Sequence, residues 1–146
     1  MNNVHGLLYG FSLALQPGNL FLVSVGCLLG TLVGVLPGIG PVGAISILLP
    51  MTFQLPHAGA IIMLAGIYYG VMYGGSTTSI LVNVPGETAS IVTCLDGYQM
   101  ARQGRAGPAL GIAAFGSFIA GTIGIIVLQL SAKFLSDIAL KFGPPE

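Results

Sequence analysis

The chain has 146 residues, of which 54% are hydrophobic and 5% are charged, and its mean hydropathy is +0.94. In soluble domains about a quarter of the residues are charged, so this composition excludes a water-soluble domain. Four basic and four acidic side chains give a net charge of zero, which excludes a basic surface for nucleic acid and an acidic tail.

The first predicted element is an amphipathic helix at the membrane interface, within residues 1–17. Its apolar residues recur at helical spacing: Val4, Leu7, Leu8, Phe11 and Leu15. The N-terminus lacks the positive region of a cleavable signal peptide, so we keep it in the mature protein. Gln16-Pro17-Gly18-Asn19 then interrupts the helix.

Two apolar stretches surround the first Pro-Gly pair, in a part of the chain without any Lys, Arg, Asp or Glu before Glu87. Residues 20–36 approach the roughly 20 residues needed to cross a bilayer. Residues 42–51 are too short to cross and are bounded by prolines. Together they predict either a re-entrant hairpin or a helix broken at Pro37-Gly38.

A further span precedes the second Pro-Gly pair, Pro85-Gly86. Residues 58–73 are predicted to form a membrane helix that ends at Gly74-Gly75. A separate short element is predicted over residues 76–84.

The most polar stretch of the chain is residues 94–107, where Asp96-Gly97 predicts a turn and two arginines indicate water or lipid headgroups. Residues 108–132 predict a full span that Lys133 ends. The positive-inside rule leaves the orientation open, because Arg102 and Arg105 precede this span and two lysines follow it. The tail carries no helix stop and looks cut, so we expect 1–146 to be a single transmembrane region of a longer chain.

Small residues recur every four positions in three stretches. They are Gly26, Gly30, Gly34 and Gly38; Gly66, Gly70 and Gly74; and Gly116, Ala120 and Gly124. This pattern is typical of helices whose backbones touch in a membrane. We expect Gly30→Ala, on such a packing face, to impair function far less than valine at Gly38 or Gly86 does.

The first candidate site is the loop with Pro37, Gly38 and Gly40. Glycine leaves no Cβ between the backbone and a ligand, and a helix that starts after the loop directs free N–H groups toward an anion. A simple kink or a turn at the membrane edge explains the same residues equally well.

The second candidate site is the polar run that ends at Pro85, Gly86 and Glu87. It contains Gly74, Gly75, Ser76, Thr77, Thr78, Ser79 and Asn83. Hydroxyls in lipid must bond something, and capping accounts for one or two of them. The rest predict a polar path or a Na⁺ site at Ser76, Thr77 and Asn83.

The sequence carries no signal for an enzyme. There is no nucleophile–base pair or phosphate loop, and His5 and His57 stand alone. Cys27 and Cys94 have no metal-type spacing, so neither a metal site nor a disulfide is predicted.

The chain is similar to one family over essentially its whole length, and three motifs together carry the similarity. They are Gly34-Val-Leu-Pro-Gly-Ile-Gly-Pro41, the stretch from Tyr69 to Glu87, and the stretch from Thr93 to Gly107. The chain resembles the large membrane subunit of bacterial tripartite tricarboxylate transporters.

The placement of Pro and Gly predicts an all-α membrane protein with several transmembrane helices and with broken or re-entrant half-helices at the Pro-Gly loops. The resemblance implies that residues 1–146 are the N-terminal part of the large subunit and form one half of an inverted-repeat transporter. It implies uptake of tricarboxylates or related carboxylates, driven by an Na⁺ or H⁺ gradient without any other cofactor. It also implies a small membrane subunit, a periplasmic solute-binding protein and a multi-pass location in the bacterial inner membrane. Two alternatives stay open: a channel or transporter for a non-carboxylate solute, and a membrane subunit that only scaffolds a partner.

We therefore hypothesise that the two Pro-Gly loops meet near the middle of the membrane and bind carboxylate and coupling ion. Gly38→Val or Gly86→Val should then abolish transport without preventing membrane insertion.

Overall fold

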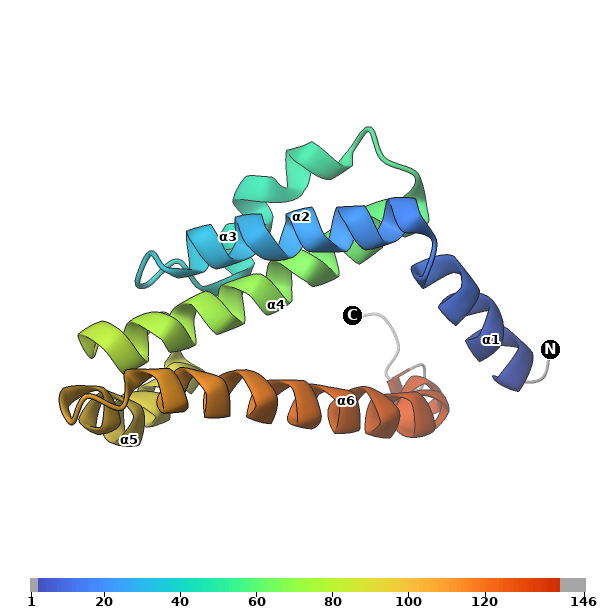
Figure 1. Cartoon of the computed structure of the whole chain (residues 1–146). Helices are drawn as coiled ribbons and strands as arrows, with labels where there is room; N and C mark the ends of the chain where they lie inside the picture. Colours follow the sequence, from blue (N-terminus) through green and yellow to red (C-terminus); the bar gives the residue numbers. More distant parts are fainter. Residues whose placement is uncertain (1–2, 140–146) are drawn as a thin grey trace, which may run out of the picture. The chain divides into compact units, whose positions relative to one another are not determined.

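The computed structural model describes residues 3–139, in two compact units of residues 1–110 and 111–146. Its elements are α1 (Asn3–Ala14), α2 (Pro17–Gly34), α3 (Gly40–Leu48), the 3-10 helix η1 (Leu49–Thr52), α4 (His57–Val82), the 3-10 helix η2 (Thr88–Ser90), α5 (Ile91–Arg102) and α6 (Ala106–Ala139) (Figure 1). No strand occurs in the described range.

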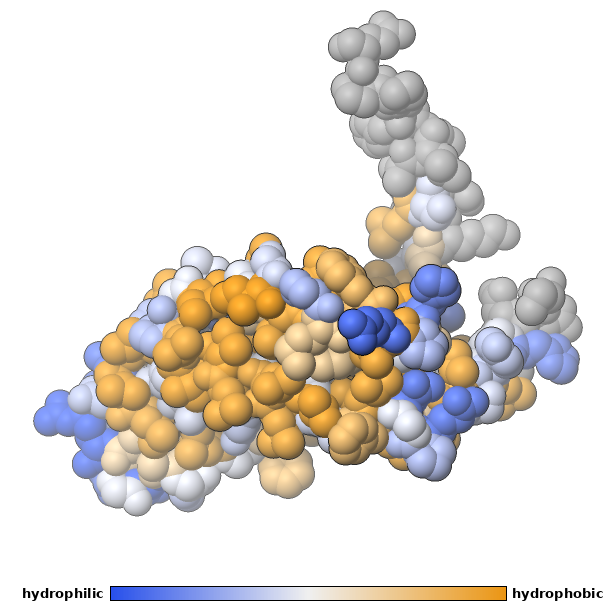
Figure 2. Space-filling view, turned by 90° about the horizontal axis from the view of Figure 1, so that it is seen from above, coloured by the Kyte–Doolittle hydropathy of each residue, from blue (hydrophilic) through white to orange (hydrophobic). Residues whose placement is uncertain are grey.

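Three helices are long and apolar enough to cross a bilayer: α2, α4 and residues 106–132 of α6. The prediction of an all-α membrane protein is therefore confirmed. Figure 2 shows that hydrophobic residues cover much of the visible surface, as expected of a protein that contacts lipid.

α2 and α4 pack backbone to backbone, side by side along most of α2 (Figure 1). Gly26, Gly30 and Gly34 face the backbone of Met63, Ile67 and Val71, and Gly66, Gly70 and Gly74 face that of Val23, Cys27 and Thr31. The residue numbers rise together along both helices, so the helices are parallel. The predicted close packing is confirmed for both glycine series within α2 and α4.

The same contacts show that Gly30 has no room for a side chain, while the effect of Gly30→Ala on transport stays a prediction. A Cβ on Gly30 would overlap the Ile67 carbonyl oxygen and lie 2.9 Å from the Ile67 Cα. Backbone atoms cannot rotate away as a side chain can, so alanine forces the two helices apart.

The segment between these parallel helices runs back to the side from which both begin. α3 packs on α4, and their shared core contains Ala44, Leu48, Met63, Ile67 and Val71. Because α3 has 9 residues and α2 has 18, α3 is a half-helix. Of the two alternatives at Pro37-Gly38, the structure has the re-entrant hairpin.

The predicted break at Gly74-Gly75 and the predicted separate element over residues 76–84 were wrong, because both lie within or directly after α4. The helix continues to Val82, and neither glycine has a positive φ. Gly74 instead permits contact with α2, since a Cβ there would lie 2.6 Å from the Thr31 carbonyl oxygen. The second interruption begins only at Asn83.

The predicted polar loop and its turn at Asp96-Gly97 were wrong, because both residues lie inside α5. A Cβ on Gly97 would lie 2.7 Å from Ile80 Cγ1, so this glycine allows α5 to approach α4. The turn comes later, at Gly104, whose φ is +78°. The exposed residues of α5 include the polar Asp96 and Gln99 as well as Val92 and Leu95, so the polar stretch did not indicate a loop.

The first and last helices, α1 and α6, both form where the sequence predicted helices. α1 forms within the predicted range 1–17, and its place at the membrane interface stays a prediction. α6 continues past Lys133, which does not end the helix, while residues 140–146 lie outside the described range. A Cβ added to Gly116 or Gly124 would have no atom within 4 Å among the described residues, so their packing role stays a prediction.

Candidate functional site

The first Pro-Gly loop joins the C-terminus of α2 to the N-terminus of α3. The Val35 and Leu36 N–H groups donate to the carbonyls of Thr31 and Val33, at 3.1 and 3.0 Å, and close the end of α2. Gly38 and Gly40 follow with φ of +88° and +62°. Open space surrounds the Cβ position of both glycines, so they are needed for their backbone conformation and leave room beside it.

The second loop ends α4 through a left-handed residue. Asn83 has φ of +60° and ψ of 30°, and it turns the chain back along α4. Gly86 then lies against Gly75, and a Cβ on Gly86 would overlap the Gly75 Cα. Only glycine at position 86 permits this contact between backbones.

The two loops meet at one backbone hydrogen bond. The Gly38 N–H donates to the Gly86 carbonyl oxygen at 3.3 Å. The Gly34 carbonyl oxygen lies 3.4 Å from the Cβ position of Gly86, so the end of α2 belongs to the same junction. We call Gly34, Gly38, Gly75 and Gly86 the loop junction. Its depth in a membrane stays a prediction.

The two helices that end at the first loop present opposite polarity there. α3 begins at Gly40, so the first N–H groups of that helix have no acceptor within it, and Pro41 has no N–H. α2 ends with carbonyl groups that likewise lack donors within it. The dipole of α3 therefore favours an anion at its start, and that of α2 favours a cation at its end.

The four consecutive hydroxyls bond to their own helix. Ser76 and Thr77 donate to the carbonyls of Met72 and Tyr73, at 3.1 and 2.9 Å. Thr78 and Ser79, both buried, donate to the Gly75 carbonyl at 2.9 and 2.8 Å. Each hydroxyl hydrogen is thus satisfied inside α4, and the oxygen keeps lone pairs for a further partner.

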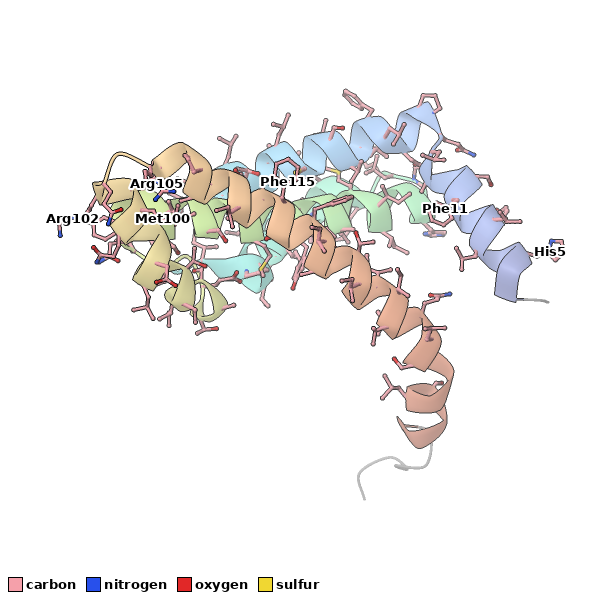
Figure 3. The ribbon with its side chains drawn as sticks, turned by 60° about the horizontal axis from the view of Figure 1, so that its bottom comes forward. His5, Phe11, Met100, Arg102, Arg105 and Phe115 are labelled. Carbon is pink, nitrogen blue, oxygen red and sulfur yellow. The ribbon has the colours of Figure 1, made fainter. Side chains whose placement is uncertain are left out.

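Glu87 takes part in starting the next helix. Its N–H donates to the Ser90 hydroxyl at 3.2 Å, and that hydroxyl donates back to the Glu87 carbonyl at 2.9 Å. Burial raises the pKa of the Glu87 carboxyl above its ordinary value. Farther along, Arg102 and Arg105 are exposed at the end of α5 and the turn after it (Figure 3).

Comparison with known proteins identifies the family. Residues 20–146 match the model of the tripartite tricarboxylate transporter TctA family. The chain belongs to the TctA family. Proteins of this family are components of transporters and not enzymes.

A curated relative of the TctA-family chain extends well beyond it. The chain is 57% identical over all 146 residues to an uncharacterized 52.8 kDa protein in the TAR-I ttuC' 3' region of Agrobacterium vitis. It spans 29% of the length of that protein. No solved structure matches the chain.

The structure of the TctA-family chain separates the sequence-predicted site residues. Gly38, Gly75 and Gly86 are brought together, with Pro37, Gly40 and Pro85 beside them in the two loops. Gly74 lies in the contact with α2, and the side chain of Asn83 is exposed. Sequence reasoning did not foresee the contact of Gly86 with Gly75. The signal in the sequence was Gly75, a glycine that does not interrupt α4 and therefore serves another purpose.

No metal centre is present in the part of the chain that the structure describes. Clusters of three or more His, Cys, Asp or Glu side chains that could hold a metal ion are absent there. Cys27 and Cys94 are both free.

Proposed function

We propose that this TctA-family chain is part of the large membrane subunit of an ion-gradient-driven transporter in the bacterial inner membrane. The transported solute is a tricarboxylate or a related carboxylate. A periplasmic solute-binding protein delivers it, and a small membrane subunit completes the transporter. The family supports the general assignment, and the Gly38–Gly86 hydrogen bond supports the position of the site.

The junction offers the groups that a carboxylate needs. A carboxylate is expensive to desolvate and requires several hydrogen-bond donors. No Lys or Arg occurs before Arg102, so the donors at this junction are backbone N–H groups at the start of α3. Gly38 and Gly40 leave open space at their Cβ positions, through which a ligand can approach those groups.

The coupling ion is proposed to bind close by. Carbonyl groups at the end of α2 favour a cation, and the hydroxyl oxygens of Ser76 and Thr77 retain free lone pairs. Oxygen ligands of this kind coordinate Na⁺ in transporters with interrupted helices. Asn83 can contribute its amide oxygen if its exposed side chain turns toward the loop.

Reconstitution of the full-length subunit with both partner proteins in liposomes tests this proposal. Radiolabelled mono-, di- and tricarboxylates are offered with an inward Na⁺ gradient, with an inward H⁺ gradient, or with neither. We expect saturable uptake of at least one carboxylate that depends on one gradient. Uptake restricted to non-carboxylate solutes, or no uptake of any solute by a correctly assembled complex, would reject the proposal.

A further inference from the structure

The peptide unit between Gly86 and Glu87 links the first loop to the short helix that follows the second. Its carbonyl oxygen accepts the Gly38 N–H at 3.3 Å, and its own N–H, which belongs to Glu87, donates to the Ser90 hydroxyl at 3.2 Å. A trans peptide unit is planar, so its C=O and N–H groups point in opposite directions and turn together. A partner that holds the N–H group therefore also sets the direction of the carbonyl group.

Glycine at position 86 leaves the direction of this peptide unit free unless hydrogen bonds fix it. A residue without a side chain changes its backbone angles at a lower steric cost than any other residue. Packing against Gly75 holds the Gly86 Cα, but the peptide unit that follows can still rotate about it. Among the described residues, the unit is hydrogen-bonded to Gly38 and Ser90, and these two bonds together orient it.

The Ser90 hydroxyl is itself held in place at the end of η2. The Ser90 side chain is 3% exposed, and its hydroxyl donates to the Glu87 carbonyl oxygen at 2.9 Å. That bond uses the single hydroxyl hydrogen, so an oxygen lone pair remains to accept the Glu87 N–H. The Ser90 N–H donates to the same carbonyl oxygen at 3.2 Å, which fixes the serine backbone as well. The position and the direction of the acceptor are therefore both defined.

We infer that Ser90 is a positioning residue for the transport site. By holding the Glu87 N–H, its hydroxyl directs the Gly86 carbonyl oxygen toward the Gly38 N–H and keeps the two loops together. α3 begins at Gly40, so the N–H donors of the proposed carboxylate site come directly after this contact. The consequence for transport rests on the proposed function, whereas the effect on the bond between Gly38 and Gly86 does not.

Hydrogen exchange at the Gly38 amide of the full-length protein in lipid nanodiscs tests the inference, read for single residues by fragmentation mass spectrometry. Ser90→Ala removes the acceptor, and Ser90→Cys keeps the size of the side chain with a weaker acceptor. Thr52→Val is the matched control. Thr52 is 4% exposed and its hydroxyl also donates to the carbonyl three residues earlier, that of Leu49, at 2.8 Å, but it accepts no hydrogen bond from the described residues.

We expect the Gly38 amide to exchange about tenfold faster in Ser90→Ala and Ser90→Cys than in the wild type, because one hydrogen bond loses its orientation. The Leu36 amide, which donates to Val33 within the end of α2, should keep its rate and serves as the internal reference. Thr52→Val should leave both rates unchanged. In the reconstituted transporter, Ser90→Ala should raise the KM for carboxylate uptake by up to about tenfold, and Thr52→Val should keep the wild-type KM.

The outcomes separate the role of Ser90 from the proposed function. Equal exchange at Gly38 in wild type and both Ser90 variants would overturn the inference. An equal rise at Leu36, or in Thr52→Val, would also overturn it, since the fold would then be loosened in general. Faster exchange at Gly38 with an unchanged KM would remove Ser90 from the transport site. Faster exchange at Gly38 alone, in a complex that takes up no carboxylate, would support the role of Ser90 at the loop junction and reject the proposed function.

Discussion

At the scale of single residues, glycine performs two different tasks in this chain. Gly30 and its counterparts let two helix backbones touch, and each of them has backbone atoms where a Cβ would go. Gly38 has open space there, but its φ of +88° is costly for any other residue. The same substitution therefore acts through overlap at one position and through backbone strain at the other.

Gly30→Ala should destabilise the protein, because the new Cβ overlaps the backbone of Ile67. Overpacking of this kind costs about 1–3 kcal/mol. Thermal unfolding of the purified full-length protein in detergent would show a lower midpoint. Gly10→Ala is the control, since Gly10 lies in α1 with nothing within 4 Å of its Cβ position. An equal midpoint for the two variants would contradict the packing account.

Glu87→Gln should change how stability depends on pH. Burial raises the pKa of the Glu87 carboxyl in the folded protein above 4.5, so the folded state favours the protonated form. The contribution of Glu87 to stability is then present at low pH and lost as the pH rises from 4.5 through the folded pKa. The difference in unfolding midpoint between wild type and Glu87→Gln should shift in favour of the variant over this window. A difference that stays constant from pH 4.5 to 7 would exclude a raised pKa.

At the scale of elements, the sequence distinguishes helix from loop well at prolines and poorly at glycines. Pro37-Gly38 and Pro85-Gly86 lie outside helices, because proline removes an N–H donor and clashes with the preceding turn, whereas Pro17-Gly18 occupies the first turn of α2, where that donor is not needed. Gly74 and Gly97 read as breaks but pack against neighbouring elements within helices. The run Ser76–Ser79 also stays helical, since its hydroxyls bond to helix carbonyls. Those differences depend on partners that a single sequence does not reveal.

Gly86→Ala should separate the two loops and abolish transport. The added Cβ overlaps the Gly75 Cα, so the returning chain must move and the hydrogen bond between Gly86 and Gly38 is lost. Uptake by the reconstituted full-length complex should fall to background, while the amount of folded protein in the membrane stays similar. Gly107→Ala, at a position with open space for its Cβ, should transport normally. Normal uptake by Gly86→Ala would make the loops structural turns and place the site elsewhere.

At the scale of the whole molecule, the chain spans 29% of the length of its curated relative, and its proposed activity belongs to the longer protein with its partners. The three apolar spans followed from composition, whereas the sequence left open whether the chain at Pro37-Gly38 forms a re-entrant hairpin or a broken helix. The meeting of the two loops was a hypothesis that the backbone contact of Gly38 with Gly86 supports. Its role in binding stays a prediction, because no ligand contact follows from a backbone geometry alone.

The full-length large subunit by itself should take up little carboxylate at low substrate concentration. A solute-binding protein captures dilute solute and presents it to the membrane subunits, which raises its local concentration at the entrance. Adding the cognate binding protein and small subunit to the same liposomes should restore uptake. Full uptake by the large subunit alone would remove the tripartite assignment.

The parallel packing of α2 and α4 also imposes an order on events during synthesis. α2 leaves the ribosome before α4 does, so its glycine stripe emerges without a partner. Two adjacent helices that enter from the same side cannot insert as a simple up-and-down pair, and the short return through α3 is too short to hold itself in the bilayer. The hairpin gains its core only as α4 arrives. The co-translational folding of this region is therefore complete no earlier than Gly74, which makes the last glycine contact with α2.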